Sequence, residues 1–178
     1  MAYTITHAQL THLPWIRRLQ AEHLREKAEQ YPTFAERDLD EFVRVVATAM
    51  AAPERFTMLI AEIGRAVVGM LSIEVTERLV GAPHRLGVAD LLYVVPRHRG
   101  KSIPDMFFRR ADEWFRARGV THVEATALDD TLGYWLERGF QPLTTRMWIE
   151  VDRFRMTRST RTRQPEKGHL RAVAGDKA

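Results

Sequence analysis

The strongest structural constraint in the chain is the stretch 90–119, where an apolar strand, a basic turn and an amphipathic helix follow one another directly. Residues 91–95 read LLYVV, and a run so rich in β-branched, aromatic and aliphatic residues predicts a buried strand. Pro96 ends that strand, because proline has no N–H to donate to a sheet. The apolar residues that follow recur at helical spacing and predict one buried helix face: Ile103, Phe107, Ala111, Trp114 and Phe115.

The turn between this strand and this helix is basic, and residues 97–101 read RHRGK. Ser102 and Asp105 have the spacing of a capping box, and Pro104 suits a first helical turn, where its missing N–H costs no helix bond. The first turn of a helix presents unpaired N–H groups and the positive end of the helix dipole. The stretch therefore predicts an anion-binding site, with a solvated basic turn as the alternative.

Two segments resemble motifs of the GNAT family, the Gcn5-related N-acetyltransferases. Residues 94–104 read VVPRHRGKSIP, which is similar to the family pattern V-x-P-x-x-R-G-x-G-x-G/A at a strand end and helix start. Residues 134–140 read YWLERGF, which is similar to the family's F-Y-E-x-x-G-F helix end. The two phosphate-facing glycines of the family fall at Ser102 and Pro104, and its usual tyrosine aligns with Trp135.

The resemblance implies acetyl-CoA as the cofactor. Its pyrophosphate would take backbone N–H groups of residues 99–103, with the charge of Arg99 or Lys101 beside it. Pro104 removes one N–H that could have met a phosphate oxygen. The cofactor-binding residues implied in this way are Leu92, Tyr93, Val94, Val95, Arg99, Gly100, Lys101, Ser102, Ile103 and Pro104.

The order of predicted elements favours an α/β (α+β) fold with a mixed, mostly antiparallel sheet and helices on both faces. Strands are predicted at 3–7, 56–63, 66–75, 91–95, 121–127 and 141–151, and helices at 8–30, 39–52, 103–118 and from 129 or 130 to 138. The parallel pair is expected between strands 91–95 and 121–127, joined by a right-handed crossover through the intervening helix. The resemblance implies a GNAT-like acyl-CoA N-acyltransferase fold in which these two strands splay apart.

The charge divides the chain into a domain, residues 1–150, and a basic, flexible tail, residues 151–178. The tail carries eight Lys or Arg against three Asp or Glu, whereas the whole chain is only +4. Nucleic-acid binding is therefore expected only through the tail, and a disordered, solubilising extension is the alternative. No cysteine, signal peptide or membrane span is found, which favours a cytoplasmic protein. No histidine pair has a metal-ligand spacing, so no metal site is expected.

Acetyl transfer to an amine needs a proton acceptor, an oxyanion donor and a proton for the leaving thiolate. We expect Asp90, at the start of the apolar strand, to be the base, because burial there would raise the pKa of its carboxyl. Glu74, Glu124 or a bridging water are alternatives, and Asp90 could instead face solvent. Tyr134 is the candidate acid, with a packed tyrosine as the alternative. The resemblance suggests the N–H of Val94 or Tyr93 as the oxyanion donor.

These observations predict an acetyl-CoA-dependent N-acetyltransferase that acetylates a primary amine by direct attack in a ternary complex. The acceptor would be a small-molecule or a protein amine. The alternative is a catalytically weak or inactive GNAT-fold protein that binds acyl-CoA or a protein partner. Family members commonly dimerise, so a homodimer is among the expected assemblies.

Overall fold

The computed structural model describes residues 2–29, 35–78, 84–127 and 131–142. The elements, in chain order, are β1 (Thr4–His7), the 3₁₀ helix η1 (Leu10–His12), α1 (Leu13–Glu26), α2 (Glu36–Ala49), β2 (Phe56–Ile63), β3 (Ala66–Glu77), β4 (Arg85–Val94), the 3₁₀ helix η2 (Pro96–His98), α3 (Ile103–Arg116), β5 (Val123–Ala125) and α4 (Leu132–Glu137).

The chain forms two compact units, Met1–Gly133 and Tyr134–Ala178. The first contains the sheet and the helices α1, α2 and α3. Of the second, the structure describes residues 134–142. The predicted domain boundary at 150/151 and the tail lie outside the described residues, as does nearly all of the predicted strand 141–151. No helix in the described ranges is both long and apolar enough to span a membrane.

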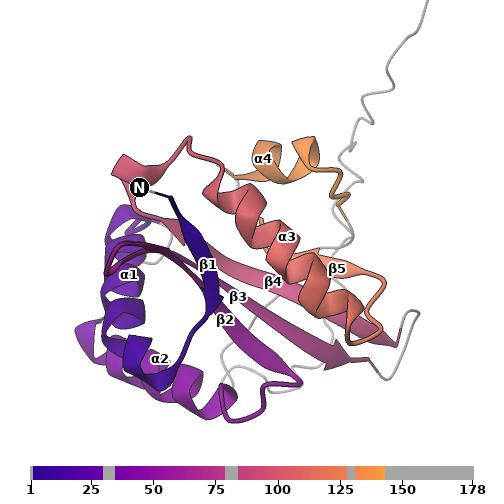
Figure 1. The fold of residues 1–178 in the computed structure, drawn as a ribbon, viewed down its shortest axis with the longest axis horizontal. Helices are drawn as coiled ribbons and strands as arrows, with labels where there is room; N and C mark the ends of the chain where they lie inside the picture. Colours follow the sequence, from indigo (N-terminus) through magenta and orange to yellow (C-terminus); the bar gives the residue numbers. More distant parts are fainter. Residues whose placement is uncertain (1, 30–34, 79–83, 128–130, 143–178) are drawn as a thin grey trace, which may run out of the picture. The chain divides into compact units, whose positions relative to one another are not determined.

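The sheet runs in the order β1-β2-β3-β4-β5 (Figure 1). The first three pairs of neighbouring strands are antiparallel, and β4 pairs with β5 in parallel. Because parallel neighbours need a crossover connection, α3 runs between these two strands along the chain. The predicted mixed, mostly antiparallel sheet is confirmed. The expected parallel pair forms between these two strands, but it involves residues 87–89, which precede the predicted strand 91–95.

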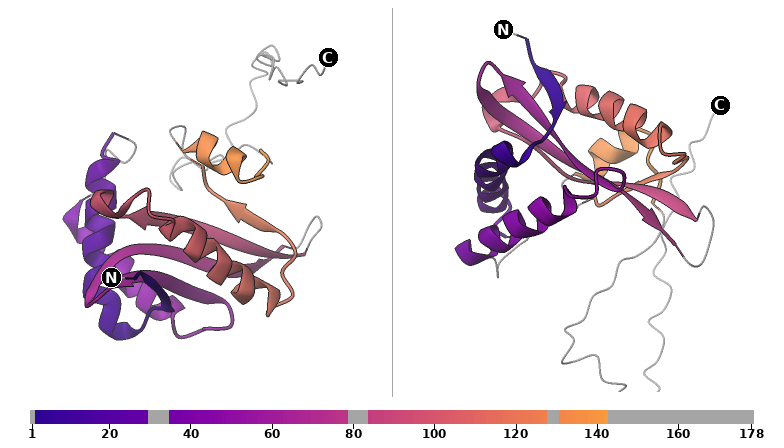
Figure 2. Two further views of the ribbon diagram at one scale, coloured as in Figure 1. Left: turned by 45° about the horizontal axis from the view of Figure 1, so that its top comes forward. Right: turned by 60° about the horizontal axis from the view of Figure 1, so that its bottom comes forward.

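Helices cover both faces of the sheet, as the turned view in Figure 2 shows. On one face, the predicted apolar side of α3 packs into a core with Leu59, Leu71 and Ile73. On the other face, Ile16 and Leu19 of α1 pack with strand residues such as Ile60 and Met70. Full burial of a large aliphatic or aromatic side chain contributes about 1.5–3 kcal/mol. The two cores therefore hold both faces of β4 between helices.

Two helices start at residues other than those predicted, one because of a proline and one where a side chain bonds the backbone at the helix start. The helix predicted over 8–30 is divided into η1 and α1, because Pro14 is tolerated only in a first helical turn. The helix predicted from 39 begins at Glu36, and the Asp38 carboxylate accepts the Ala35 N–H at 2.7 Å. This bond satisfies one of the N–H groups at the helix start.

Strand β4 is the largest difference among the strands. It begins at Arg85 rather than at residue 91, because residues 85–90 pair with residues 72–77 at the end of β3. No element was predicted for residues 85–89, and an antiparallel hairpin tolerates polar residues such as Arg85 on its solvated side. Conversely, β5 covers only Val123–Ala125 of the predicted strand 121–127.

At Gly87, the ring of Phe115 on α3 lies close against the backbone of β4. A Cβ built at Gly87 would lie 2.5 Å from a ring carbon of Phe115. Real side chains do not approach so closely, so the packing of α3 on β4 requires a residue without a side chain here.

We predict that Gly87→Ala lowers the free energy of unfolding by about 1–3 kcal/mol, because the ring or the helix must shift to admit the methyl group. Urea denaturation monitored by circular dichroism measures the change. Gly133→Ala is the matched control, since a Cβ there meets no heavy atom within 4 Å. Equal stabilities for the two variants would contradict the close packing of α3 against β4.

Candidate functional site

The edge of β4 that faces β5 is paired over only part of its length. The parallel ladder joins Gly87, Val88 and Ala89 to Val123, Glu124 and Ala125. Beyond Ala89, β4 continues to Val94, and no strand in the described ranges pairs with that edge. We call residues 90–94 the open edge of β4. This is the side where the two strands were expected to part, and of its backbone groups the Val94 carbonyl already accepts a hydrogen bond from Arg99.

A β-bulge lies within this open edge. The register pairs Met70 with Tyr93 and Ser72 with Asp90, so β4 has one more residue than β3 in this interval. Leu91 takes a positive φ of 51° there, which is costly for a residue with a branched side chain. A bulge bends the strand and re-aims its side chains, and bulges are frequent beside functional sites.

The bulged strand directs the N–H of Val94 toward the open edge. The Val95 N–H donates to the Val68 carbonyl at 3.0 Å, and Tyr93 pairs with Met70. Backbone groups alternate in direction along an antiparallel strand, so Tyr93 and Val95 face β3 and Val94 faces away from it. Of the two oxyanion candidates, Val94 therefore has the suitable orientation.

The basic turn presents several N–H groups together. In the part of the chain that the structure describes, no acceptor bonds to the backbone N–H of Gly100, Lys101, Ser102 or Ile103. Gly100 and Ser102 have positive φ angles of 70° and 57°. The predicted cap was wrong on one point: the Ser102 side chain makes no capping bond, because a left-handed residue does not have the extended geometry of an N-cap.

The cofactor residues from the strand are mostly enclosed. Tyr93, Val94, Val95 and Ile103 are buried, and Leu92 is partly buried against the α3 core. Lys101 is exposed beside the turn. The site therefore offers backbone groups and the exposed cations Arg97 and Lys101, while its apolar side chains hold the strand and helix in place.

The turn is tied through His98 to Tyr3, the residue that precedes β1. The hydroxyl of Tyr3 and Nδ1 of His98 lie 3.0 Å apart in a hydrogen bond. Partial burial and then the charges of Arg97 and Lys101 lower the pKa of His98, which favours the neutral ring. His98 is thus a structural contact as well as a turn residue.

Arg99 does not extend freely from the turn. Its Nε donates to the Val94 carbonyl at 2.9 Å, and Nη2 donates to Oε2 of Glu26 on α1 at 2.7 Å. The hydrogen bond from Arg99 lowers the pKa of Glu26, and the same bond raises the pKa of Arg99. Both directions favour a charged pair.

Asp90 is exposed, which corrects the burial expected of it. The Ser72 hydroxyl donates to the Asp90 carbonyl at 2.9 Å and fixes the backbone next to the bulge. Among the alternatives, Glu74 is exposed, and Glu124 forms an ion pair with Arg78 with a nitrogen–oxygen distance of 2.7 Å. Asp90 is therefore the candidate carboxylate on the open edge.

Sequence analysis missed His23. It lies on α1 with its ring centroid 5.4 Å from that of Tyr93. Burial, followed by the charge of Lys27, lowers the pKa of His23, while Glu26 and Asp90 raise it. Its spacing of four and seven residues from Leu19 and Ile16 could have placed it on the buried face of the helix.

Tyr134 lies in the second unit. The Arg138 guanidinium lies over its ring at 3.7 Å, and the neighbouring Trp135 is buried with its ring centroid 4.9 Å from that of Phe140. The proposed role of Tyr134 as an acid stays a prediction.

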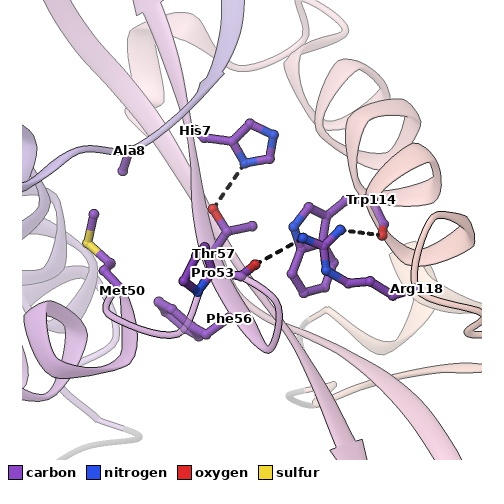
Figure 3. A pocket seen from close by; sticks show the side chains of 8 residues that line it. All are labelled: His7, Ala8, Met50, Pro53, Phe56, Thr57, Trp114 and Arg118. Carbon is purple, nitrogen blue, oxygen red and sulfur yellow. Dashed lines mark hydrogen bonds between the residues drawn. The ribbon is translucent and has the colours of Figure 1, made fainter.

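A separate pocket of about 390 Å³ lies at the other end of α3 (Figure 3). It is lined by His7, Ala8, Met50, Pro53, Phe56, Thr57, Trp114 and Arg118. The Arg118 guanidinium stacks 3.8 Å from the Trp114 ring centroid and donates to the Pro53 carbonyl at 3.0 Å. Since α3 has 14 residues, the pocket is about 20 Å along the helix from the basic turn. None of the predicted site residues line it.

Many solved structures share the fold, and three of them illustrate the similarity. A predicted acetyltransferase with acetyl-CoA from Clostridium acetobutylicum is 16% identical, with a TM-score of 0.68 over 84% of this chain and 96% of that chain. A Gcn5-related N-acetyltransferase from Ralstonia eutropha is 20% identical, with a TM-score of 0.70 over 85% and 99%. Glucosamine-6-phosphate N-acetyltransferase from Arabidopsis thaliana is 11% identical, with a TM-score of 0.60 over 85% and 100%.

Sequence comparison identifies the family directly. No curated protein sequence matches this chain. The family model described as the acetyltransferase (GNAT) family matches residues 16–140, which is more than half of the chain. That range includes the open edge of β4, the basic turn and α3. The chain therefore belongs to the GNAT family of acetyltransferases.

Proposed function

We propose that this protein is an N-acetyltransferase that transfers the acetyl group of acetyl-CoA to a primary amine by direct attack in a ternary complex. The observation that carries the proposal is the continuity of two sets of backbone donors. The open edge of β4, with the Val94 N–H facing outward, leads through Pro96 into the N–H groups of residues 100–103.

The basic turn fits a pyrophosphate. Helix N-termini and turns with successive N–H groups bind anions because the N–H dipoles converge on the ligand. Gly100, Lys101, Ser102 and Ile103 would hold the pyrophosphate through these groups, and the Lys101 ammonium would add charge. Pro104 offers no N–H, so the donor set ends at Ile103.

The open edge of β4 fits the remainder of the cofactor. An extended pantetheine arm has amide groups that can pair with an exposed strand edge. Leu92 and Val94 would border this arm, and the Val94 N–H would donate to the thioester oxygen as it gains negative charge. Acetyl-CoA would supply the acetyl group as an activated thioester.

The acceptor must attack as a neutral amine. Its nitrogen forms a bond to the carbonyl carbon, its proton passes to a base, the carbon–sulfur bond breaks and the thiolate takes up a proton. We assign the base to Asp90, which lies beside the bulge at the start of the open edge. The Arabidopsis relative, a glucosamine-6-phosphate N-acetyltransferase by name, is consistent with an amine acceptor.

A second candidate is an acyl-CoA-binding protein with little or no turnover. Ser102 and Pro104, which replace the family glycines, favour it because they add a side chain and remove an N–H where phosphates would bind. Acetyl-CoA binding without release of coenzyme A across a panel of amines would select this candidate.

We predict that Lys101→Ala weakens acetyl-CoA binding about tenfold, since a hydrogen bond to a charged group contributes about 1.5 kcal/mol at the lower end of its range. Isothermal titration calorimetry measures the dissociation constant. Arg116→Ala is the matched control, because Arg116 is an exposed cation at the opposite end of α3, paired with Asp112 at 2.8 Å. Unchanged affinity in a folded Lys101→Ala variant would argue against the turn as the phosphate site.

We predict that Asp90→Asn lowers turnover about a hundredfold, which is within the range of general bases, and leaves acetyl-CoA affinity nearly unchanged. The loss should shrink as pH rises, because more of the amine is already neutral. Coenzyme A release from pH 6 to 10 provides the measurement, with His23→Gln assayed alongside. If Asp90→Asn is as active as wild type while His23→Gln is inactive, the base is His23 and not Asp90.

A further inference from the structure

The side chain of Arg99 joins three groups from two elements that are far apart in sequence. Its Nε donates to the Val94 carbonyl and its Nη2 to Glu26, and its guanidinium carbon lies 5.7 Å from the centroid of the Tyr93 ring. Two of these groups belong to the end of β4, and Glu26 is the last residue of α1. One guanidinium therefore connects the basic turn, the open edge and the α1 helix.

The contact with Val94 restrains the peptide group between Val94 and Val95 from both sides. Nε of Arg99 donates to the Val94 carbonyl of this peptide at 2.9 Å, and the Val95 N–H of the same peptide donates to the Val68 carbonyl at 3.0 Å. Val94 lies on the open edge, where β5 gives no support. Arg99 thus replaces a strand neighbour at the position next to the proposed oxyanion donor.

The pairing with Glu26 also limits the capacity of Arg99 to bind a phosphate. The positive charge is offset by a carboxylate 2.7 Å away, and two N–H groups of the fork are already engaged. A phosphate ligand in the turn would need that charge and those donors to be free. Partly exposed ion pairs of this kind contribute little to stability, so a role besides stabilisation of the fold is worth testing.

We propose that Arg99, held by Glu26, is a positioning residue that fixes the end of β4 for catalysis and is not a ligand of the cofactor phosphates. This inference rests on the proposed acetyltransferase function. It makes Glu26, a residue of α1 outside the family motifs, part of the machinery that orients the Val94 N–H.

The variant Glu26→Gln separates the two roles because they predict opposite effects. For a positioning pair, turnover falls about tenfold and the acetyl-CoA dissociation constant stays within twofold of wild type. If Arg99 instead binds the cofactor phosphates and Glu26 restrains it, the variant frees Arg99, and acetyl-CoA binds several-fold more tightly. Tighter binding with normal turnover would overturn the inference.

Three further variants complete the design. Arg99→Lys keeps the charge but loses the fork, and we expect the same loss of turnover as in Glu26→Gln. The double variant should lose no more than either single variant, because both disrupt one unit. Glu22→Gln is the matched control: Glu22 lies one turn earlier on α1, is paired with Arg18 at 3.3 Å, and should leave turnover unchanged.

Hydrogen exchange of the Val95 amide tests the same inference without cofactor or turnover. We expect it to exchange about tenfold faster in Glu26→Gln than in wild type or Glu22→Gln, because Arg99 loses the charged partner that holds it against the Val94 carbonyl. Equal rates would overturn the positioning role even if the protein proved inactive. Wild-type protein that neither binds acetyl-CoA nor releases coenzyme A would instead contradict the proposed function.

The pair also has a pH signature. The pKa of Glu26 lies below its ordinary value of 4.5, chiefly through Arg99 and in smaller part through Lys27 and His23. The ionised Glu26 carboxylate therefore contributes its full stabilisation above pH 4.5, and this contribution is lost as pH falls through the lowered pKa of the folded state. The difference in unfolding free energy between wild type and Glu26→Gln should be constant at neutral pH and shrink in acid. A difference that grows in acid would contradict the ion pair.

Discussion

The parallel pairing of β4 with β5 stops at Ala89 and Ala125, and the site depends on this limit. A strand buried between two helical layers normally satisfies its backbone groups on both edges, because a buried unpaired N–H is costly. Beyond Ala89, β4 still pairs with β3 on one edge, and in the described residues no strand pairs with its other edge. The other edge presents donors in an ordered strand, and an extended ligand with amide groups could pair with them.

The open edge stays ordered because its surroundings are well packed. Ile103 and Phe107 of α3 are fully buried on one face, and Tyr93 and Val95 pack with the α1 core on the other. The turn that follows this edge is held by His98 to Tyr3, just before β1, and by Arg99 to Glu26 on α1. These contacts restrain the turn before any ligand binds, which reduces the ordering that binding would require.

Sequence patterns predicted the elements that follow local rules. The strand, proline, basic turn and apolar helix face around 91–115 were predictable because periodicity and chain breakers act over short distances. The parallel pairing followed from the intervening helix and from crossover handedness. The family motifs implied the splayed strands, and the ladder that ends at Ala89 agrees with this.

The remaining features come from tertiary pairing and could not be predicted locally. Leu91 adopts a positive φ because the register of β3 imposes a bulge, and leucine gives no local indication of one. Asp90 is exposed because the hairpin, not its apolar neighbours, sets its direction. The pairing of Glu26 with Arg99 joins residues 73 positions apart, and nothing in the spacing of either residue indicates it.

The most direct test of the site is amide chemical-shift mapping of the ¹⁵N-labelled protein during titration with acetyl-CoA. The chain is 20.6 kDa, a size suited to such spectra. We predict that the largest shifts occur in two groups, residues 92–95 on the open edge and residues 100–103 in the basic turn. The pocket beside Trp114 should respond little. Shifts centred on His7, Thr57 and Trp114, with none in the turn, would contradict the placement of acetyl-CoA along the open edge of β4.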